Sequence, residues 1–294
     1  MTKKTVNHRH LLGAPVRDHI IDEVRTYVDA AGKMGKIVSI AVDGNAEVEV
    51  YIRNQARMAA RVGLDFDQQM WSRDITQDAC KSRIQDMNDD PSVLGIIIQR
   101  PLPPHINIRS LQSAVHPLKD LEGMNPASIG NIIYSDIALV PCTAAASVEM
   151  IKATGLTLPG LEVVMIGHSE IVGRPAAMML MAECATVTIC HHMTRSVAMH
   201  SRRADVVLVA VGSPHLIGAD MIKPGAVVID IGINQITTDD GISHIVGDVD
   251  TAAVAEVAGW ITPVPGGVGP VTVAVLMRNA KTAHMRQTQI GWRA

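Results

Sequence analysis

The sequence predicts an α/β fold of two domains, each built around a parallel β-sheet. Short apolar runs of strand length alternate with segments of helical spacing, which is the pattern of β-α-β units. The boundary between the two domains is expected between residues 140 and 148, after which the alternation of strands and helices resumes with a different composition. A chain of 294 residues is also long enough for two domains.

The first half of the chain alternates helices and strands. Residues 16–32 have helical spacing, and residues 36–42 (KIVSIAV) form a β-branched run typical of a strand. Residues 48–63 predict an amphipathic helix and residues 78–90 a further helix. A buried strand is expected within residues 92–104 (SVLGIIIQRPLPP), where prolines end it.

The second half contains five more strand-like runs, each short, apolar and ended by glycine, proline or a polar residue. They are residues 161–167, 185–190, 205–212, 226–232 and 259–265. A last helix is expected over residues 272–287. The expected domains are therefore residues 1–142, with a C-terminal helix at 271–294 packing back on them, and residues 143–270.

The composition excludes several classes of protein. Lys and Arg total 26 against 29 Asp and Glu, and they are scattered, so a nucleic-acid partner is not expected. With three Trp, three Tyr and one Phe, base stacking is not a main function. The four cysteines form no CxxC pair and no ligand-like spacing with histidine, which predicts neither a metal site nor disulfides; they are Cys80, Cys142, Cys184 and Cys190.

Neither a signal peptide nor a membrane span is expected. The first residues lack an apolar signal segment, and no apolar run reaches the roughly 18 residues of a span. We therefore expect a cytoplasmic protein without a membrane partner.

Residues 163–181 predict a strand, a tight glycine-containing turn and a helix. Gly167 and Gly173 lie where the backbone would approach a pyrophosphate at the N-terminus of the helix. The segment is not GxGxxG, and glycine at such a turn is also common for structural reasons. Both interpretations stay open on these residues alone.

The next strand ends without the acidic residue that would bind the ribose of NAD. His191, His192 and Arg195 follow it instead, and such side chains suit a 2′-phosphate. The sequence thus favours NADP, with NAD possible, although paired histidines after a strand also occur in solvated loops.

Four separated segments together resemble the methylenetetrahydrofolate dehydrogenase/cyclohydrolase family. They are GIIIQRPLP, KDLEGMNPASIG, GHSEIVGRP and TPVPGGVGPVT, and the resemblance covers nearly the whole chain. It implies two α/β domains with a folate-binding cleft between them, a Rossmann-type NAD(P) domain and, usually, a homodimer.

The resemblance also implies roles for individual residues. Gln99 is similar to the family's cleft glutamine, Tyr51 to the tyrosine that stacks near the pterin, and the loop Pro265, Gly266 and Gly267 to the one that borders the folate. The residues expected at the cofactor are Thr143, Gly167, His168, Ser169, Ile171, Gly173, Arg174, His191, His192, Arg195, Gly212 and Ile233.

Several positions depart from the family's pattern. On the helix at 48–63, Gln55 stands where the family has its catalytic lysine, and Val48 where it has serine. Glu122 replaces the pterin-binding aspartate, and His168 stands where many members have arginine. PCTAAA at 141–146 lacks the proline and glycine expected in a loop near the nicotinamide.

These departures separate the family's two reactions. Hydride transfer needs positioning and no proton transfer, whereas opening the methenyl group needs proton handling. The neutral side-chain amide of Gln55 can neither accept nor release a proton at neutral pH, so it cannot act as a general acid or base. The sequence therefore predicts an NADP-dependent dehydrogenase of methylenetetrahydrofolate with weak or absent cyclohydrolase activity, its expected catalytic residues being Tyr51, Gln55, Gln99 and Glu122.

Two alternatives remain open. One is a non-catalytic binding or regulatory homologue, because four departures lie in one site. The other is a dehydrogenase for a different one-carbon pterin carrier, with Val48 and Glu122 reshaping the pocket.

Overall fold

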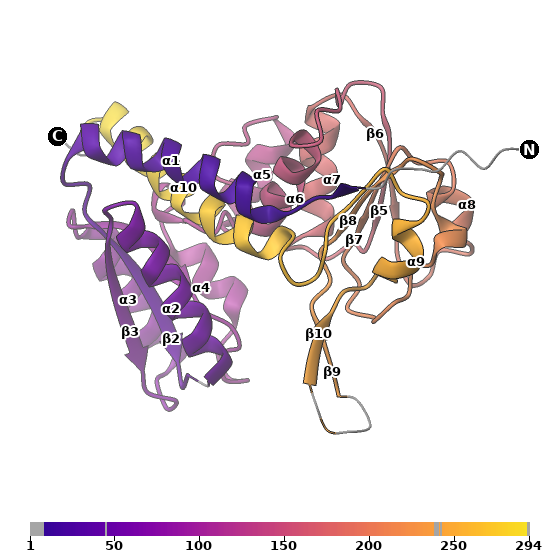
Figure 1. Ribbon diagram of the computed structural model, residues 1–294. Helices are drawn as coiled ribbons and strands as arrows, with labels where there is room; N and C mark the ends of the chain where they lie inside the picture. The colour runs from indigo at the N-terminus through magenta and orange to yellow at the C-terminus, as the bar shows by residue number, and fades with distance from the viewer. Residues whose placement is uncertain (1–8, 45, 238–240, 242, 293–294) are drawn as a thin grey trace, which may run out of the picture. The chain divides into compact units, whose positions relative to one another are not determined.

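The computed structural model describes residues 9–44, 46–237, 241 and 243–292 (Figure 1). The chain forms two compact units, each made of separate segments. Unit 1 comprises Met1–Arg17 and Thr143–Thr272, and unit 2 comprises Asp18–Cys142 and Val273–Ala294.

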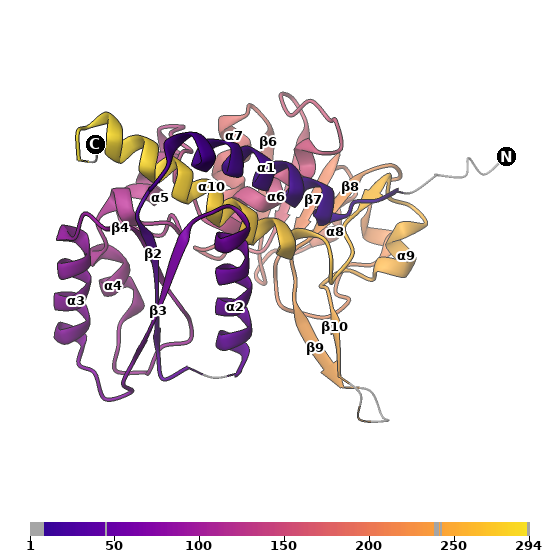
Figure 2. The same cartoon turned by 60° about the vertical axis from the view of Figure 1, so that its left-hand side comes forward.

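Unit 2 is built on a three-stranded parallel sheet. The central strand β2 (Lys36–Val42) lies between β3 (Asp65–Trp71) and β4 (Val93–Ile98). Helix α2 (Ala46–Arg61) covers one face, while α3 (Gln77–Asp89) and α4 (Ile108–Ala114) cover the other (Figure 2).

Both faces of the central strand are buried, which explains its nearly continuous apolar sequence. Val38, Ile40 and Val42 pack in one hydrophobic cluster with side chains of α3 and α4. Ala41, on the opposite face, packs with Val48 of α2. Ser39 shares the α2 face because side chains alternate along a strand.

Two long helices contribute to unit 2. Residues 18–31 of α1 (Gly13–Ala31) run beside residues 273–289 of α10 (Val268–Gln289) (Figures 1 and 2). The Tyr27 hydroxyl and His284 Nδ1 are 2.9 Å apart, and Lys281 pairs with Glu23. Unit 2 also contains the helix α5 (Pro126–Ile133) and the 3₁₀ turn η1 (Pro117–Lys119).

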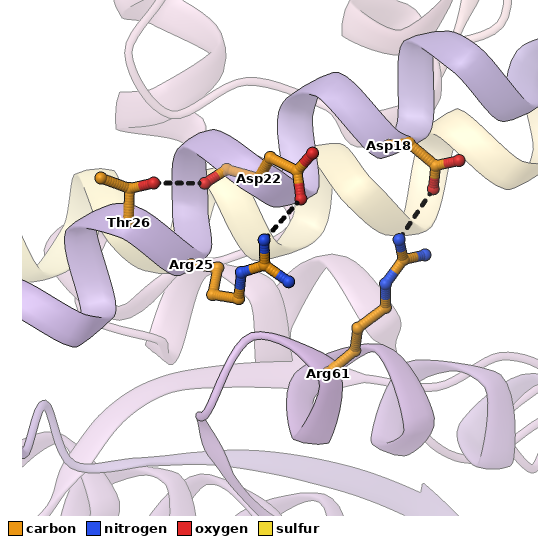
Figure 3. A network of polar contacts seen from close by, with 5 residues as sticks. All are labelled: Asp18, Asp22, Arg25, Thr26 and Arg61. Carbon is orange, nitrogen blue, oxygen red and sulfur yellow. Dashed lines mark hydrogen bonds and ion pairs between the residues drawn. The ribbon is translucent and has the colours of Figure 1, made fainter.

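An ion pair joins α1 to the end of α2. Arg61 reaches Asp18 with a nitrogen–oxygen distance of 3.0 Å, as Figure 3 shows. One turn further along α1, the Asp22 carboxylate accepts from the Arg25 guanidinium at 3.0 Å. The backbone carbonyl of Asp22 accepts from the Thr26 hydroxyl at 2.8 Å. These groups are exposed, so each pair contributes about 0–1 kcal/mol.

Unit 1 is built on a six-stranded parallel sheet in the order β1-β11-β8-β7-β5-β6. The strands are β1 (Arg9–His10), β5 (Glu162–Ile166), β6 (Thr186–Cys190), β7 (Val206–Val209), β8 (Val227–Asp230) and β11 (Trp260–Ile261). Its other elements are α6 (Cys142–Lys152), α7 (Gly173–Ala182), α8 (Val197–Ser201), η2 (Ala219–Met221), α9 (Thr251–Ala255) and the antiparallel hairpin of β9 (Asn234–Thr237) and β10 (Ser243–Val246).

The strand order of unit 1 contains a switch point. The chain passes from β5 to β6 on one side, and then returns to place β7 on the other side of β5. Ile166, Cys190 and Val209 are level at the carboxyl ends of these strands. Ligands of open parallel sheets bind at such a point, because the loops after adjacent strands diverge there.

The prediction of a two-domain α/β fold with parallel sheets is confirmed. Two details differ. Strand β1 pairs with β11, so the segment before α1 belongs to unit 1 and not to a domain of residues 1–142. The residues after Pro141, expected as a loop, begin helix α6, in which Ala144, Ala145 and Ala146 are buried.

No helix in the described part of the chain combines the length and the apolar character needed to cross a bilayer.

Candidate functional site

A row of hydrogen-bonded polar side chains lies between the sheet of unit 2 and α2. Gln99, directly after β4, donates from Nε2 to Gln55 Oε1 at 2.7 Å and to Ser39 Oγ at 3.0 Å. Tyr51 lies one turn before Gln55 on α2; burial raises the pKa of its hydroxyl, and Gln55 acts to lower it. The hydrogen-bonded row therefore runs from the central strand to α2 and links three side chains, with Tyr51 next to it.

The spacing of α2 explains how this row forms. Val48, Ile52 and Gln55 all lie on the helix face that packs on the sheet, and each is at most 6% exposed. Tyr51 lies beside that face and is 41% exposed. Val48 packs against Ala41 and Ile52, so the structure places it in the core, and its role in substrate binding stays a prediction.

Glu122 lies at the edge of the same sheet. The segment containing it runs along β4, with a parallel bridge between Ile96 and Asp120. The backbone N–H of Ile98 donates to Glu122 Oε2 at 2.9 Å. Burial, together with the nearby Asp120 carboxylate, raises the pKa of Glu122 to about 7, although the Ile98 N–H and Arg100 act to lower it.

Buried hydrogen bonds fix the loop on both sides of Glu122. Asp120 accepts from the Asn125 backbone N–H at 2.6 Å and from the Ser128 hydroxyl at 2.9 Å, while burial raises its pKa. Asn279 of α10 donates to the carbonyls of Leu121 at 2.8 Å and Val140 at 3.0 Å.

Gly123 is required next to Glu122. Its φ of 67° favours glycine, and a Cβ there would overlap the backbone of Val140. This glycine lets the chain turn sharply after the carboxylate.

Lys119, in the same KDLEG segment, is not available for proton transfer at Glu122. It is 1% exposed, and its Nζ donates to the carbonyls of Met87 at 2.8 Å and Asp90 at 2.7 Å. Its ammonium is therefore used to hold backbone segments together.

In unit 1, the turn between β5 and α7 brings backbone segments very close together. A Cβ on Gly173 would overlap the carbonyl of Gly167, and a Cβ on Gly167, whose φ is 117°, would overlap that of Ala210. The close approach of these backbone segments therefore explains why both positions are glycine. The Ser169 hydroxyl accepts from the backbone N–H of Val172 at 3.2 Å and from that of Gly173 at 3.4 Å. A pyrophosphate at this helix N-terminus would therefore share these two N–H groups with Ser169.

Three histidines gather at the ends of β5 and β6. The ring centroids of His168 and His191 are 4.8 Å apart, and that of His192 lies 6.2 Å from His168. Local desolvation, together with the proximity of His191, Arg174 and His192, lowers the pKa of His168. The Arg174 guanidinium supplies a positive charge and the imidazole N–H groups can donate hydrogen bonds, so this end of the sheet suits a nucleotide that carries a 2′-phosphate.

The remaining cofactor candidates surround this end of the sheet or lie near it. Gly212 follows β7, has a φ of 67° and is exposed, while Ile233 follows β8 and is 71% exposed. Ile171 is 37% exposed in the turn before α7. Arg174 and Arg195 are also exposed, whereas Thr143 is half-buried in the first turn of α6.

The loop Pro265, Gly266 and Gly267 joins β11 to α10. It is exposed at Pro265 and Gly266, and the Gly13 N–H donates to the Gly266 carbonyl at 2.9 Å. This loop belongs to unit 1, and the Glu122 segment belongs to unit 2.

Sequence reasoning missed several polar residues that the structure places beside the expected ones. Ser39 is the one hydroxyl in the apolar run KIVSIAV, a signal that could have identified it. Asp120, Asp230 and Asp248 are buried carboxylates in otherwise apolar or glycine-rich segments. Among the described residues, no group of three or more His, Cys, Asp or Glu side chains could hold a metal ion.

Two family models match most of the chain. The catalytic domain of tetrahydrofolate dehydrogenase/cyclohydrolase matches residues 11–122, and the NAD(P)-binding domain of the same family matches residues 141–288. A protein of Roseobacter denitrificans named bifunctional protein FolD 3 is 70% identical over 286 residues, which cover 97% of this chain and 99% of that protein.

Solved structures agree with these matches. The bifunctional enzyme FolD of Campylobacter jejuni is 33% identical with a TM-score of 0.90, covering 95% of this chain and 99% of that one. The Trypanosoma brucei methylenetetrahydrofolate dehydrogenase-cyclohydrolase, solved with NADP and an inhibitor, is 32% identical with a TM-score of 0.85, covering 94% and 96%. The chain described here therefore belongs to the tetrahydrofolate dehydrogenase/cyclohydrolase family.

Proposed function

We propose that this chain oxidises 5,10-methylenetetrahydrofolate to 5,10-methenyltetrahydrofolate with NADP, and that its cyclohydrolase activity is weak or absent. Family membership supports the dehydrogenase assignment. The loss of hydrolysis is supported by one observation. The hydrogen bond from Gln99 Nε2 to Gln55 Oε1 holds a neutral amide at the position where the family's lysine is expected.

The two reactions make different demands on the side chains of this row. Bound NADP supplies the hydride acceptor, so the protein must orient the folate and exclude water. Gln55 and Gln99 can orient the folate because their hydrogen bonds limit their movement, and Tyr51 lies one turn before Gln55 on the same helix. Adding water to the methenyl cation requires a proton acceptor, and neither amide is one at neutral pH.

Glu122 is proposed to bind the N–H edge of the pterin. The hydrogen bond from the Ile98 N–H holds its carboxylate at the end of β4. A half-buried carboxylate benefits from a hydrogen-bond donor, which the pterin edge supplies. Glu122→Gln should raise the folate KM at least tenfold while the NADP Kd stays within twofold of that of the unmodified protein. An unchanged folate KM would remove Glu122 from the binding site.

NADP is proposed over NAD because of the groups at the ends of β5 and β6. His168, His191 and His192 lie together there, with Arg174 and Arg195 exposed nearby. A 2′-phosphate gains hydrogen bonds and charge pairing from such side chains. Kinetics with the two cofactors test this, and a preference for NAD would refute it.

The central test measures both reactions on one preparation. Absorbance follows formation of the reduced cofactor from methylenetetrahydrofolate, and separately the decay of methenyltetrahydrofolate. We expect hydride transfer with hydrolysis at least about 10²-fold slower, since loss of a general acid–base group costs about 10²- to 10⁴-fold. Hydrolysis as fast as hydride transfer would contradict the role of Gln55. Cofactor binding without turnover would instead favour a non-catalytic homologue, unless another one-carbon pterin carrier restores turnover.

Two substitutions at one position sharpen the test. Gln55→Lys should increase hydrolysis, whereas Gln55→Met should not, although both remove the amide. Lysine cannot accept from Gln99 Nε2, so the Gln99 amide must turn its oxygen toward the ammonium. Ser39 permits this, because its hydroxyl can donate as well as accept. Equal hydrolysis in both variants would show that the ammonium is not the missing group.

We also infer a homodimer, as the family resemblance implies. Light scattering after size-exclusion chromatography should give a mass near twice the 31.5 kDa of one chain, and a monomer would refute the inference.

A further inference from the structure

A buried carboxylate in unit 1 accepts four hydrogen bonds from two different loops. Asp248 has no solvent exposure. Its Oδ2 accepts from the backbone N–H of Val211 at 2.6 Å and of Gly212 at 3.0 Å. Its Oδ1 accepts from the N–H of Ser213 and from Asn234 Nδ2, both at 2.8 Å. Each oxygen of the Asp248 carboxylate therefore accepts two hydrogen bonds from donors of the protein itself.

These donors belong to two loops at the carboxyl end of the sheet. Val211, Gly212 and Ser213 follow β7, next to the switch point. Asn234 begins β9, directly after the loop that follows β8. One carboxylate thus links the loop containing Gly212 to Asn234, the residue that follows Ile233. Gly212 and Ile233 are both expected to contact the cofactor.

The surroundings of Asp248 are built to hold its carboxylate in place. A Cβ on Gly232 would overlap this carboxylate, so only glycine fits there. A second buried carboxylate, Asp230, accepts from the backbone N–H of Asp248 at 3.0 Å, of Val249 at 2.9 Å and of Gly232 at 3.0 Å. The backbone that carries Asp248 is therefore fixed as well as its side chain.

We propose that Asp248 is a positioning residue for the cofactor, which holds the loops after β7 and β8 in a single arrangement before NADP binds. The proposal rests on the proposed function, because it assumes that these loops contact NADP. A loop that is already ordered loses less conformational entropy on binding, which increases affinity. The charge of Asp248 also matters, because a carboxylate can accept from four donors without presenting one of its own.

The substitution Asp248→Asn tests this proposal with almost no change in side-chain size. Each oxygen of Asp248 accepts from two donors, so the amide nitrogen of an asparagine would face two donors in either orientation. Asp205→Asn is the matched control. Asp205 also accepts a backbone N–H, that of Glu162 at 3.0 Å, but it lies at the opposite end of the same sheet.

The experiment measures NADP binding by calorimetry, together with kcat, both KM values and the melting temperature. We expect Asp248→Asn to raise the NADP Kd at least tenfold, about 1.4 kcal/mol, and to leave the folate KM within twofold. Asp205→Asn should lower the melting temperature without changing the NADP Kd. A purely structural role for Asp248 would give the same pattern as Asp205→Asn, and would overturn the proposal.

A milder variant covers the case in which Asp248→Asn does not fold. Asn234→Ala removes the contact between Asp248 and the base of the hairpin, and should raise the NADP Kd about threefold. An unchanged Kd in this variant would overturn the coupling of the two loops. If the unmodified protein itself binds no NADP, the proposed function fails first, and the positioning role fails with it.

Discussion

Replacing Glu122 by glutamine should stabilise the protein at alkaline pH even though it weakens folate binding. Burial raises the pKa of Glu122 to about 7 from an ordinary value of 4.5. The folded protein therefore holds this proton more tightly than the unfolded chain. The resulting stabilisation is fully present below pH 4.5, and it is lost as the pH rises through 7.

The magnitude follows from the size of the pKa shift. One pKa unit corresponds to about 1.4 kcal/mol. A carboxyl group whose pKa is about 7 in the folded protein and 4.5 in the unfolded chain therefore lowers the free energy of unfolding by about 2.5 kcal/mol between pH 5 and pH 8. Glutamine has no such titration, and its carbonyl oxygen can still accept from the Ile98 N–H. The difference in unfolding free energy between the two proteins should therefore change by about 2.5 kcal/mol over this range, in favour of Glu122→Gln.

Urea titrations of both proteins at pH 5, 6, 7 and 8 measure this difference. Other ionisable groups are common to both proteins and largely cancel. Glu149→Gln serves as a control, because this acid lies on α6 and belongs to the other unit of the chain. A difference between Glu122→Gln and the unmodified protein that stays constant from pH 5 to pH 8 would refute the raised pKa.

Three further substitutions test the supports of the two sites. Gly123→Ala should lower the free energy of unfolding, measured in urea, by more than about 2 kcal/mol, because Gly123 has a φ of 67° and a Cβ there would overlap Val140. Gly130→Ala in α5 is the control, because a Cβ there meets no other atom. It should be neutral or stabilising by up to about 1 kcal/mol. Asn279→Leu should cost about 2 kcal/mol, since two buried carbonyls lose their donor, and an unchanged urea midpoint would contradict this. Gly173→Ala should abolish NADP binding in calorimetry by forcing the β5–α7 turn apart, and normal binding would show that the turn can relax.

The parts of the fold that the sequence predicted are those with strong hydrophobic patterns. Strand β2 is covered on both faces, so KIVSIAV is apolar almost throughout. Strand β3 (Asp65–Trp71) was missed, because it is an edge strand whose outward positions carry aspartate and glutamine. The hairpin of β9 and β10 was also missed. Among the described residues its two strands pair only with each other, and neither strand contains a buried residue.

The site shows a similar division. The i and i+4 spacing predicted that Tyr51 and Gln55 share a face, and in the structure Tyr51 lies beside the buried face that carries Gln55. Ser39 could not be linked to Gln99 from the sequence, because 60 residues separate them and only strand pairing brings them together. The role of Asp248 depends on contacts across separate loops, and no local pattern encodes such contacts.

The order in which the chain is synthesised has a consequence for the folding of unit 2. Asn279 and Gln287 of α10 donate to four backbone carbonyls, those of Leu94, Leu118, Leu121 and Val140. These carbonyls are made long before α10, because residues 143–267 all lie between them and the helix. During translation, the segment around Glu122 therefore leaves the ribosome without its donors, and unit 2 can complete its fold only after unit 1 has been synthesised. Nascent unit 2 should accordingly stay sensitive to protease until α10 emerges.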